Sequence, residues 1–120
     1  MIHGKNVIGF DMSAEGSVTF QTFSPATLQK LPEKFVQATP AELEKAVAKA
    51  VSAYTIYKRK SGKERALFIR AIAEEIELLG TALIERACAE SGLPEGRITG
   101  ERGRTVNQLR LFATVLEDGS

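Results

Sequence analysis

Apolar and polar residues alternate along the first part of the chain, which is typical of β-strands. Residues 17–23, Ser-Val-Thr-Phe-Gln-Thr-Phe, follow this alternation, and residues 6–10 form another extended stretch. The turn-forming residues 13–16 lie between them, so the pattern predicts a β-hairpin made of these two stretches. After a turn at residues 24–27, a short third strand is predicted at residues 34–37.

A helical period begins at Thr39, where Thr39-Pro40-Ala41-Glu42 forms a capping box with proline at the first helical position. The predicted helix carries an apolar stripe whose members recur every three or four residues: Leu43, Ala46, Val47, Ala50, Val51 and Tyr54. Because the charged residues lie mostly off this stripe, one side of the helix is expected to be buried.

Further helical stretches follow. Ser61-Gly62-Lys63-Glu64 is a second capping box and opens the next predicted helix. Gly80-Thr81 predicts a stop or kink with a new cap, and residues 91–94, Ser-Gly-Leu-Pro, predict a helix end. A last helix is predicted from about Ile98 to Val115. The expected fold class is an α+β fragment, in which an N-terminal hairpin with a short third strand is followed by three or four helices.

Length and composition fit one small globular unit. The 120 residues are 43% hydrophobic and 26% charged, and 16 Lys and Arg residues nearly balance 15 Asp and Glu residues. A net charge of +1 gives the chain no general attraction for nucleic acid or an anionic membrane. We expect a single segment, residues 1–120, with a hairpin and extended region at 1–38 and a helical region at 39–120.

Cysteine and histidine usage restricts the chemistry of the chain. Cys88 is the only cysteine and His3 the only histidine, which predicts no intramolecular disulfide and no Cys/His zinc site. The first residues lack the apolar core of a secretory signal, and no stretch approaches the roughly 18 apolar residues of a membrane span. A cytoplasmic location is therefore expected. Cys88 lies in an apolar-periodic stretch without a neighbouring base, which predicts a packed helical residue rather than a nucleophile.

Glycine-rich and basic stretches lack the features of a phosphate site. Residues 100–105, Gly-Glu-Arg-Gly-Arg-Thr, have neither the spacing nor the lysine of a phosphate-binding loop, and no Gly-x-Gly-x-x-Gly occurs between Gly4 and Gly9. The 100–105 stretch is interpreted as a glycine-loosened start of a helix with exposed arginines. A basic cluster flanks a predicted helix end, where positive charge complements the helix dipole: Lys58, Arg59, Lys60 and Lys63.

The remaining charged residues have a simple interpretation as solvated helix faces. Four arginines could form a basic surface for nucleic acid, but Glu95 and Glu101 are interleaved with them and reduce its positive charge. These arginines are Arg97, Arg102, Arg104 and Arg110. Glu74, Glu75 and Glu77 fall on the polar side of a helix with no histidine or metal ligand nearby in sequence. The residues by themselves therefore predict no catalytic, cofactor-binding or metal site.

The order of segments carries more information than any single motif. A hairpin ending in Phe23-Ser24-Pro25-Ala26-Thr27, a capped Ala/Val helix, residues 65–73 and residues 89–94 together resemble the N-terminal portion of the NAD(P)-dependent aldehyde dehydrogenases. The resemblance covers essentially the whole chain. Residues 73–87 and 100–113 look like one branch, the 2,5-dioxovalerate (α-ketoglutaric semialdehyde) dehydrogenases.

The resemblance implies an oxidoreductase in which a thiolate attacks an aldehyde, hydride passes to NAD(P)+, and a Glu-activated water hydrolyses the thioester. In that family the nucleophilic Cys, the general-base Glu, the oxyanion-stabilising Asn and the nucleotide-binding strands lie later in the chain. None of these roles is carried onto a residue here, Cys88 included. The segment is expected to pack against the cofactor domain, to bind no cofactor itself and to be inactive alone. The choice of NAD or NADP, the aldehyde, the oligomeric state and the natural end of the chain stay open.

One turn departs from the family pattern. The family's Asn-Pro-Ala-Thr-Gly-Glu stands here as Ser24-Pro25-Ala26-Thr27-Leu28-Gln29, so Leu28 replaces a glycine that tolerates positive φ. This departure predicts a longer or differently shaped turn.

Two functions from different classes are compatible with the sequence. The first is a scaffold segment of an aldehyde dehydrogenase, whose partner is the rest of the dehydrogenase chain or, through exposed apolar helix faces, a second copy. Such a segment is expected to be poorly stable or self-associating in isolation. The second is a stand-alone helical interaction module, which should exclude solvent from Phe68, Ile72 and Phe112 within its own 120 residues.

Overall fold

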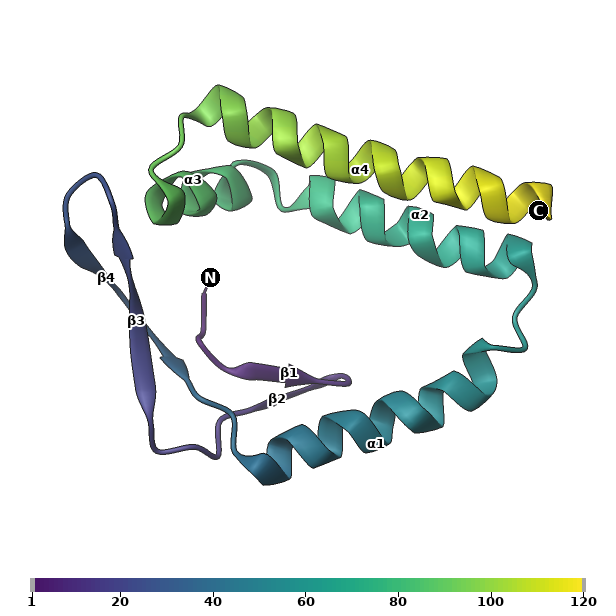
Figure 1. The fold of residues 1–120 in the computed structure, drawn as a ribbon, viewed down its shortest axis with the longest axis horizontal. Coiled ribbons are helices and arrows are strands. Elements are labelled where there is room, and N and C mark those ends of the chain that lie inside the picture. Colours follow the sequence, from purple (N-terminus) through teal and green to yellow (C-terminus); the bar gives the residue numbers. More distant parts are fainter. Residues whose placement is uncertain (1, 120) are drawn as a thin grey trace. The chain divides into compact units, whose positions relative to one another are not determined.

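The computed structural model describes residues 2–119, in which strands precede helices along the chain (Figure 1). The strands are β1 (Asn6–Ile8), β2 (Asp11–Ser13), β3 (Thr19–Ser24) and β4 (Gln29–Val36). The helices are α1 (Pro40–Tyr57), α2 (Gly62–Leu78), α3 (Gly80–Ser91) and α4 (Glu95–Asp118). The predicted fold class, an α+β fragment, is confirmed. The chain divides into two compact units, one up to Arg59 and one from Lys60 onward. Helix α1 belongs to the first unit, where it packs onto β1 and bonds to β2.

The strand pairing differs from the predicted hairpin. β1 pairs antiparallel with β2 through the turn Gly9-Phe10, and β3 pairs antiparallel with β4, so residues 6–10 and 17–23 belong to separate hairpins. Gly9 has a φ of +66°, as the two-residue turns of hairpins require at their first position. The sequence hides this hairpin because Asp11-Met12-Ser13 has weak strand propensity.

The strand predicted at residues 34–37 is the end of a longer strand, β4. Its pattern is interrupted by Pro32, which lies at an irregularity of the register where residues 31–33 stand opposite Thr22. Proline is tolerated at such a position because it has no N–H to give to the ladder. Phe20 and Phe35 stack across the β3–β4 pair, with ring centroids 5.6 Å apart.

The loop from Pro25 to Leu28 joins β3 and β4. Leu28 has a φ of +59° and is the one non-glycine residue in 2–119 with a positive φ. Its N–H donates to the Ser24 carbonyl at 2.8 Å, which closes the loop. Leu28 itself therefore takes the left-handed conformation that the family's glycine tolerates, and no lengthening of the turn is needed to explain the loop.

The Glu42 side chain connects α1 to the end of β2 and to the residues that follow it. This residue is only 1% exposed, and one carboxylate oxygen accepts hydrogen bonds from the Ser13 hydroxyl and from the Glu15 N–H at 3.2 Å. The other oxygen accepts from the Thr39 N–H at 2.9 Å, while Thr39 Oγ1 accepts from the Glu42 N–H at 3.1 Å. The predicted capping box is thus confirmed. These donors, Ser13 foremost, lower the pKa of Glu42 to about 2.

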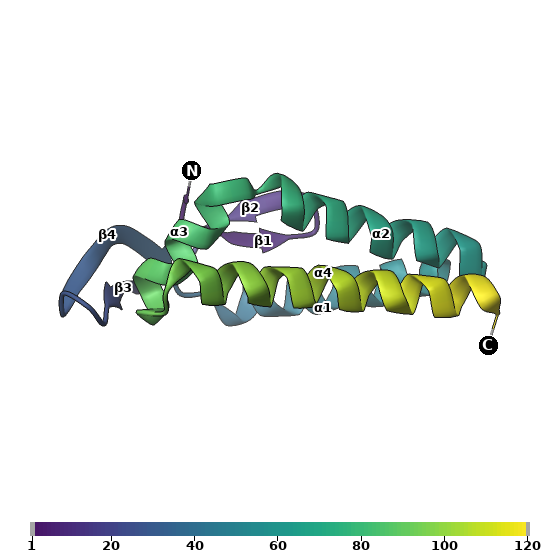
Figure 2. The ribbon, with the colours of Figure 1, turned by 90° about the horizontal axis from the view of Figure 1, so that it is seen from above.

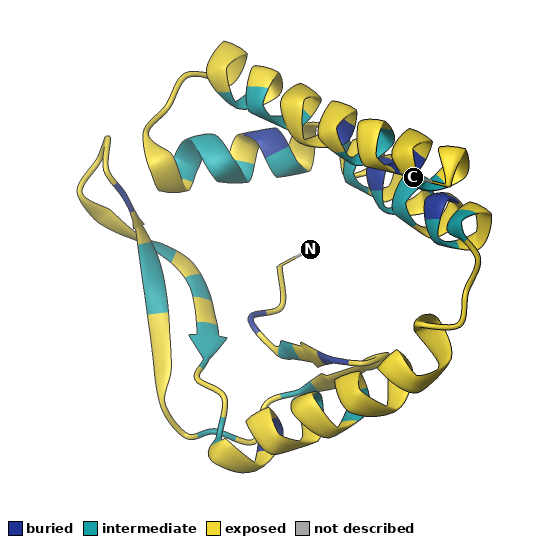
Figure 3. Ribbon diagram, turned by 45° about the vertical axis from the view of Figure 1, so that its right-hand side comes forward, coloured by how far each residue is buried: buried dark blue, intermediate teal, exposed yellow. Residues whose placement is uncertain are grey.

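Lys49 makes a second attachment between α1 and the first hairpin. Its ammonium group donates to the Ile8 carbonyl at 3.2 Å and to Asp11 Oδ2 at 3.0 Å, beside the buried Ile8 side chain. The predicted apolar stripe of α1 is largely exposed (Figure 3). The exposed fractions of its larger members run from 51% to 63%: Leu43, Val47, Val51 and Tyr54. These residues are therefore exposed within residues 2–119, and their burial against further chain stays a prediction.

In the second unit, α2 and α4 run antiparallel side by side (Figures 1 and 2). The side chains buried between them are small, with Ala66 and Ala73 on α2 and Val106 and Ala113 on α4. Within each helix the two residues are spaced about two turns apart, so each pair forms a line along the helix. Such small side chains let the helix backbones approach closely.

The helix ends follow the predicted signals in part. α2 begins at the predicted capping box of Ser61, and Gly80, with a φ of +57°, makes the predicted break. The cap predicted there is wrong, because the start of α3 has no side-chain cap hydrogen bond. α4 begins at Glu95 rather than near Ile98, since Pro94 has the extended φ and ψ of −70° and 153° that suit an N-cap.

We expect Leu28→Gly to stabilise the chain. The left-handed conformation strains a non-glycine residue by about 1–2 kcal/mol, and substitution by glycine removes this strain. Glycine also raises the entropy of the unfolded state, which offsets roughly 0.5–1 kcal/mol of that gain. The free energy of unfolding, measured by chemical denaturation, should rise by a few tenths to about 1 kcal/mol. Ala26→Gly, in the same loop but without a positive φ, is the matched control and should lower it. A Leu28→Gly variant that is no more stable than the parent would contradict strain at this position.

Glu42→Gln should weaken the attachment of the first hairpin to α1, because an amide nitrogen would then face N–H or O–H donors. The pKa of Glu42 in the folded state is about 2, against a usual value of 4.5. The ionised carboxylate therefore contributes stability above pH 4.5, and this contribution is lost as the pH falls from 4.5 to 2. The melting-temperature difference between parent and variant should be largest near neutral pH and shrink over that interval.

Glu64→Gln is the matched control for the Glu42 substitution. Glu64 occupies the same place in the exposed second capping box, and hydrogen bonds from Ser61 lower its pKa to about 2 as well. Its loss should fray the first turn of α2 alone. Hydrogen exchange at the Glu15 amide should speed up in Glu42→Gln and stay unchanged in Glu64→Gln. Equal exchange at Glu15 in both variants would refute the attachment described above.

Candidate functional site

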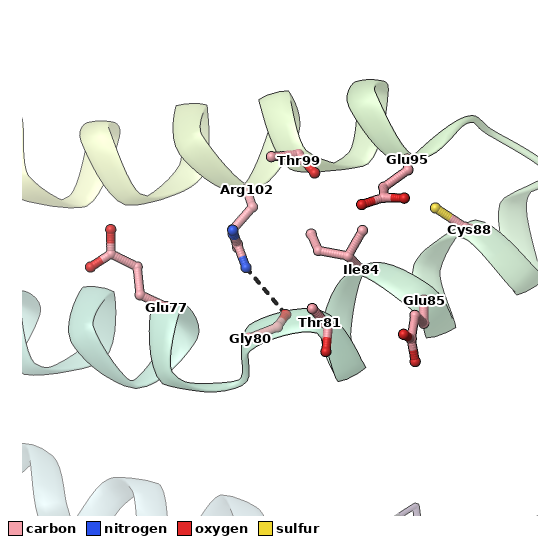
Figure 4. Close-up of a pocket in the computed structure, with 9 residues that line it drawn as sticks. All are labelled: Glu77, Gly80, Thr81, Ile84, Glu85, Cys88, Glu95, Thr99 and Arg102. Carbon is pink, nitrogen blue, oxygen red and sulfur yellow. Dashed lines mark hydrogen bonds between the residues drawn. The ribbon is translucent and has the colours of Figure 1, made fainter.

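A cleft of about 530 Å³ lies where α3 and α4 meet the end of α2 (Figure 4). The residues that line it include a thiol, three carboxylates and one guanidinium: Glu77, Gly80, Thr81, Ile84, Glu85, Cys88, Glu95, Thr99 and Arg102. Ile84 is 5% exposed and supplies the buried apolar part of the lining. The cleft is thus the place in the second unit where groups with chemical potential gather.

Arg102 has a structural role in this cleft. Its Nη1 donates to the Gly80 carbonyl at 3.2 Å, which ties α4 to the break between α2 and α3 (Figure 4). The sequence interpretation of Arg102 as an exposed arginine at a loosened helix start is wrong. Gly100 and Gly103 lie in the interior of α4, and Arg102 is half-buried. The sequence carries no signal for this contact, because it joins residues on different helices.

Cys88 lies on α3 and is half-buried, as a small packed helical residue is expected to be. Its thiol shares the cleft with Glu85 and Glu95. A nucleophilic cysteine is activated by a neighbouring base or cation. The only histidine of the chain, His3, belongs to the other unit, and the Arg102 guanidinium is bonded to a backbone carbonyl. The arrangement around Cys88 is that of a packed residue.

Among the three glutamates singled out on α2, the structure separates one from the others. Glu74 and Glu75 are exposed, as predicted for a solvated face. Glu77 forms a two-pronged ion pair with Arg110 of α4, with N···O distances of 2.7 and 3.2 Å. The hydrogen bond from Arg110 lowers the pKa of Glu77. Glu77 therefore joins two helices and is not poised for proton transfer.

A second ion pair of the same kind was not apparent from the sequence. Arg70 of α2 donates to both carboxylate oxygens of Glu117 on α4 at 3.0 Å, and to Thr114 Oγ1 at 3.3 Å. The hydrogen bond from Arg70 lowers the pKa of Glu117. Both side chains belong to ordinary polar helix faces, so only the antiparallel pairing of α2 and α4 brings them together.

The other arginines of α4 also bind carboxylates. Arg97 and Arg104 contact Glu101 at 3.0 and 3.5 Å, within the same helix. Pairs of this spacing on an exposed helix face contribute a few tenths of a kcal/mol each, roughly 0.2–0.5. Of the four arginines considered for nucleic-acid binding, Arg97 and Arg104 thus share one carboxylate and Arg110 has another, whereas Arg102 donates to a backbone carbonyl.

The basic cluster at the end of α1 and the start of α2 is exposed. The Lys58 ammonium lies 5.3 Å from the centroid of the Tyr54 ring, a cation–π contact within α1. Lys60 pairs with Glu64 at 3.1 Å beside the second capping box. Lys58 and Lys60 therefore each have a partner nearby in sequence.

The described residues do not fit a metal or dinucleotide site. In residues 2–119 no three His, Cys, Asp or Glu side chains are grouped so as to hold a metal ion. Dinucleotides bind at the carboxyl ends of parallel strands, whereas both sheets in the described part of the chain are antiparallel pairs. That this segment binds no cofactor stays a prediction. None of the helices within 2–119 has the length and apolar character needed to cross a membrane.

The chain belongs to the aldehyde dehydrogenase family, whose model matches residues 12–120. The resemblance drawn from the sequence is thereby confirmed.

Curated relatives refine this assignment. The chain is 45% identical to alpha-ketoglutaric semialdehyde dehydrogenase 2 of Azospirillum brasilense over 117 residues. This match covers 97% of this chain and 22% of that protein. It is 38% identical to alpha-ketoglutaric semialdehyde dehydrogenase of Acinetobacter baylyi, over 98% of this chain and 22% of that protein. It is 34% identical to 3-sulfolactaldehyde dehydrogenase of Pseudomonas putida, over 88% of this chain and 21% of that protein. The chain thus spans about a fifth of the length of these relatives.

Two glycines test the geometry of the break beside the cleft. A Cβ at either Gly80 or Gly103 would meet nothing within 4 Å, but only Gly80 has a positive φ. Gly80→Ala should therefore lower the free energy of unfolding by about 1–2 kcal/mol. Gly103→Ala, inside α4, should raise it by up to about 1 kcal/mol. Opposite signs in chemical denaturation are expected, and a Gly80→Ala variant as stable as the parent would rule out the left-handed break.

Proposed function

We propose that this chain is the N-terminal scaffold segment of an oxidoreductase that oxidises 2,5-dioxopentanoate (α-ketoglutaric semialdehyde) to 2-oxoglutarate with NAD(P)+. The observation that carries the proposal is the 45% identity, over 97% of the chain, to an enzyme named for that semialdehyde. The overall reaction adds the oxygen of one water to the aldehyde carbon and passes a hydride to the nicotinamide.

The described residues support a scaffold role rather than a catalytic one. The thiol, guanidinium and carboxylates of the cleft belong to helix packing, helix pairing or solvent-facing surface. In the proposed enzyme this segment positions neighbouring parts of the domain, and the groups that react with the aldehyde come from elsewhere in the chain. The isolated 120 residues are proposed to be inactive and to bind no dinucleotide.

A stand-alone interaction module has less support. Such a module would bury its large apolar side chains within 120 residues, but Phe68 and Phe112 are 55% and 53% exposed. Exposed aromatic side chains of this size favour a segment that is completed by further protein. We propose a cytoplasmic location, since the single cysteine offers no intramolecular disulfide, and no nucleic-acid or membrane partner, since the charges are balanced and locally paired.

Segment exchange tests the proposal. The 117 matched residues of the Azospirillum brasilense enzyme are replaced by this chain, and NAD(P)H formation from the semialdehyde is followed by absorbance. We expect kcat/KM within about tenfold of the parent enzyme, equivalent to a loss of no more than about 1.4 kcal/mol. The 120-residue chain alone should form no NAD(P)H and show no saturable NADP+ binding.

The matched control is the same exchange in the Pseudomonas putida 3-sulfolactaldehyde dehydrogenase, where identity falls to 34%. The hybrid with the less similar enzyme is expected to retain less of its parent's activity on that parent's own substrate. A folded Azospirillum hybrid without semialdehyde turnover would count against the proposed function, and so would turnover by the isolated chain.

A further inference from the structure

Helix α4 carries a hollow of about 400 Å³ whose lining combines charged, neutral polar and apolar side chains. It is lined by Glu101, Arg104, Thr105, Gln108 and Leu109. Arg104 lies roughly 200° round the helix axis from Val106, which is buried against α2. The guanidinium group of Arg104 therefore lies on the side of α4 opposite its contact with α2. The volume of the hollow is within the range of small-molecule sites, roughly 300–1,000 Å³.

The guanidinium group of Arg104 is the most exposed among the four arginines of α4. Its side chain is 79% exposed, and its contact with Glu101 Oε1 is long, at 3.5 Å. The same carboxylate oxygen accepts a hydrogen bond from Arg97 Nε at 3.1 Å. Two guanidinium groups thus share one carboxylate, which leaves one positive charge in excess beside the hollow. Most N–H groups of Arg104 are therefore open to an anion.

The relatives of the chain indicate which kind of anion this is. Two are named for α-ketoglutaric semialdehyde and one for 3-sulfolactaldehyde. The first aldehyde carries a carboxylate and the second a sulfonate, in each case at the end opposite the aldehyde group. Arginine binds such oxyanions well, because its planar guanidinium group donates two parallel N–H groups.

We propose that Arg104 binds the carboxylate of 2,5-dioxopentanoate, and that it determines the preference of the complete enzyme for aldehydes with an acid group. The inference rests on the proposed function. Gln108, one turn further along α4, offers its amide N–H to the 2-oxo group, and Leu109 offers apolar surface to the methylene groups. The Thr105 hydroxyl already donates to the Glu101 carbonyl at 3.0 Å, so it serves as part of the wall. Arg104 acts on substrate choice and takes no part in the chemical step.

Substitutions in the Azospirillum hybrid, in which this chain replaces the 117 matched residues, test this role of Arg104. Arg104→Gln should raise KM for the semialdehyde roughly 10- to 100-fold and leave kcat nearly unchanged, since a charge-assisted hydrogen bond to bound substrate is lost. Arg104→Lys, which keeps the charge but not the paired N–H groups, should give an intermediate KM. Arg59→Gln is the matched control. It removes an exposed positive charge outside the hollow and should leave KM unchanged.

Two further kinetic constants separate the sources of the anion. KM for pentanal, an uncharged aldehyde, should be the same in Arg104→Gln as in the unsubstituted hybrid, because pentanal has no carboxylate to lose a partner. KM for NADP+ should also be unchanged. A rise in KM for NADP+ alone would assign Arg104 to a phosphate group of the cofactor and overturn the proposal. An equal loss with pentanal would show a structural role and overturn it too.

Equilibrium binding of 2-oxoglutarate, measured by calorimetry, examines the hollow without turnover. Its dissociation constant should rise roughly 10- to 100-fold in Arg104→Gln and stay unchanged in Arg59→Gln. A folded hybrid that binds 2-oxoglutarate through Arg104 but does not oxidise the semialdehyde refutes the proposed reaction alone. An active hybrid whose KM for the semialdehyde and affinity for 2-oxoglutarate do not depend on Arg104 refutes this inference alone.

Discussion

Burial of apolar surface is the constraint on which both units depend. The apolar side chains buried within residues 2–119 are few and mostly small: Ile8, Ala66, Ala73, Ile84, Val106 and Ala113. Phe68 and Phe112, which carry far more apolar surface, are more than half exposed. Since burial contributes about 25 cal/mol per Å² of apolar surface, alanines with their small surface add little to the free energy of unfolding. These small side chains allow the backbones of α2 and α4 to approach closely.

Polar contacts determine the position of α1 on the first hairpin and the register of α4 along α2. Glu42 accepts hydrogen bonds from residues before α1, so it fixes where the helix starts relative to the first hairpin. Arg70 with Glu117 and Arg110 with Glu77 bridge α2 and α4 beside the alanine seam. Exposed ion pairs of this kind contribute little to the free energy of unfolding. Their main effect is on register, because a two-pronged guanidinium contact specifies which turn of α4 faces which turn of α2.

The parts of the fold that could be predicted are those encoded locally. Thr39 and Ser61 mark helix starts because a capping box needs only four consecutive residues. The left-handed Gly92 after α3 likewise ends a helix through its own backbone freedom. The two units use the same capping motif, but Glu42 accepts hydrogen bonds from the distant Ser13 and Glu15, whereas the donor that reaches Glu64 from outside its box is the adjacent Lys60. That second role depends on tertiary packing and has no sequence signature.

The parts that could not be predicted depend on pairing between distant residues. Strand alternation predicts that residues 17–23 are extended, but it does not predict their partner strand. The turn at Gly9-Phe10 pairs β1 with β2, so β3 pairs with β4 instead of β1. The contact from Arg102 to Gly80 joins residues 22 positions apart on different helices, so no local sequence pattern predicts it.

The polar groups of the cleft show why sequence chemistry and site chemistry diverge in this chain. A carboxylate acts as an acid or base when its proton is free to move, but Arg110 holds Glu77 in its ionised form. A guanidinium binds a ligand anion when its donors are free, but Arg102 donates to a backbone carbonyl. Both groups are committed to the contact between α4 and the end of α2. In the scaffold role proposed above, these two groups would contribute the position of the helices, since the contacts that hold the helices together occupy both groups.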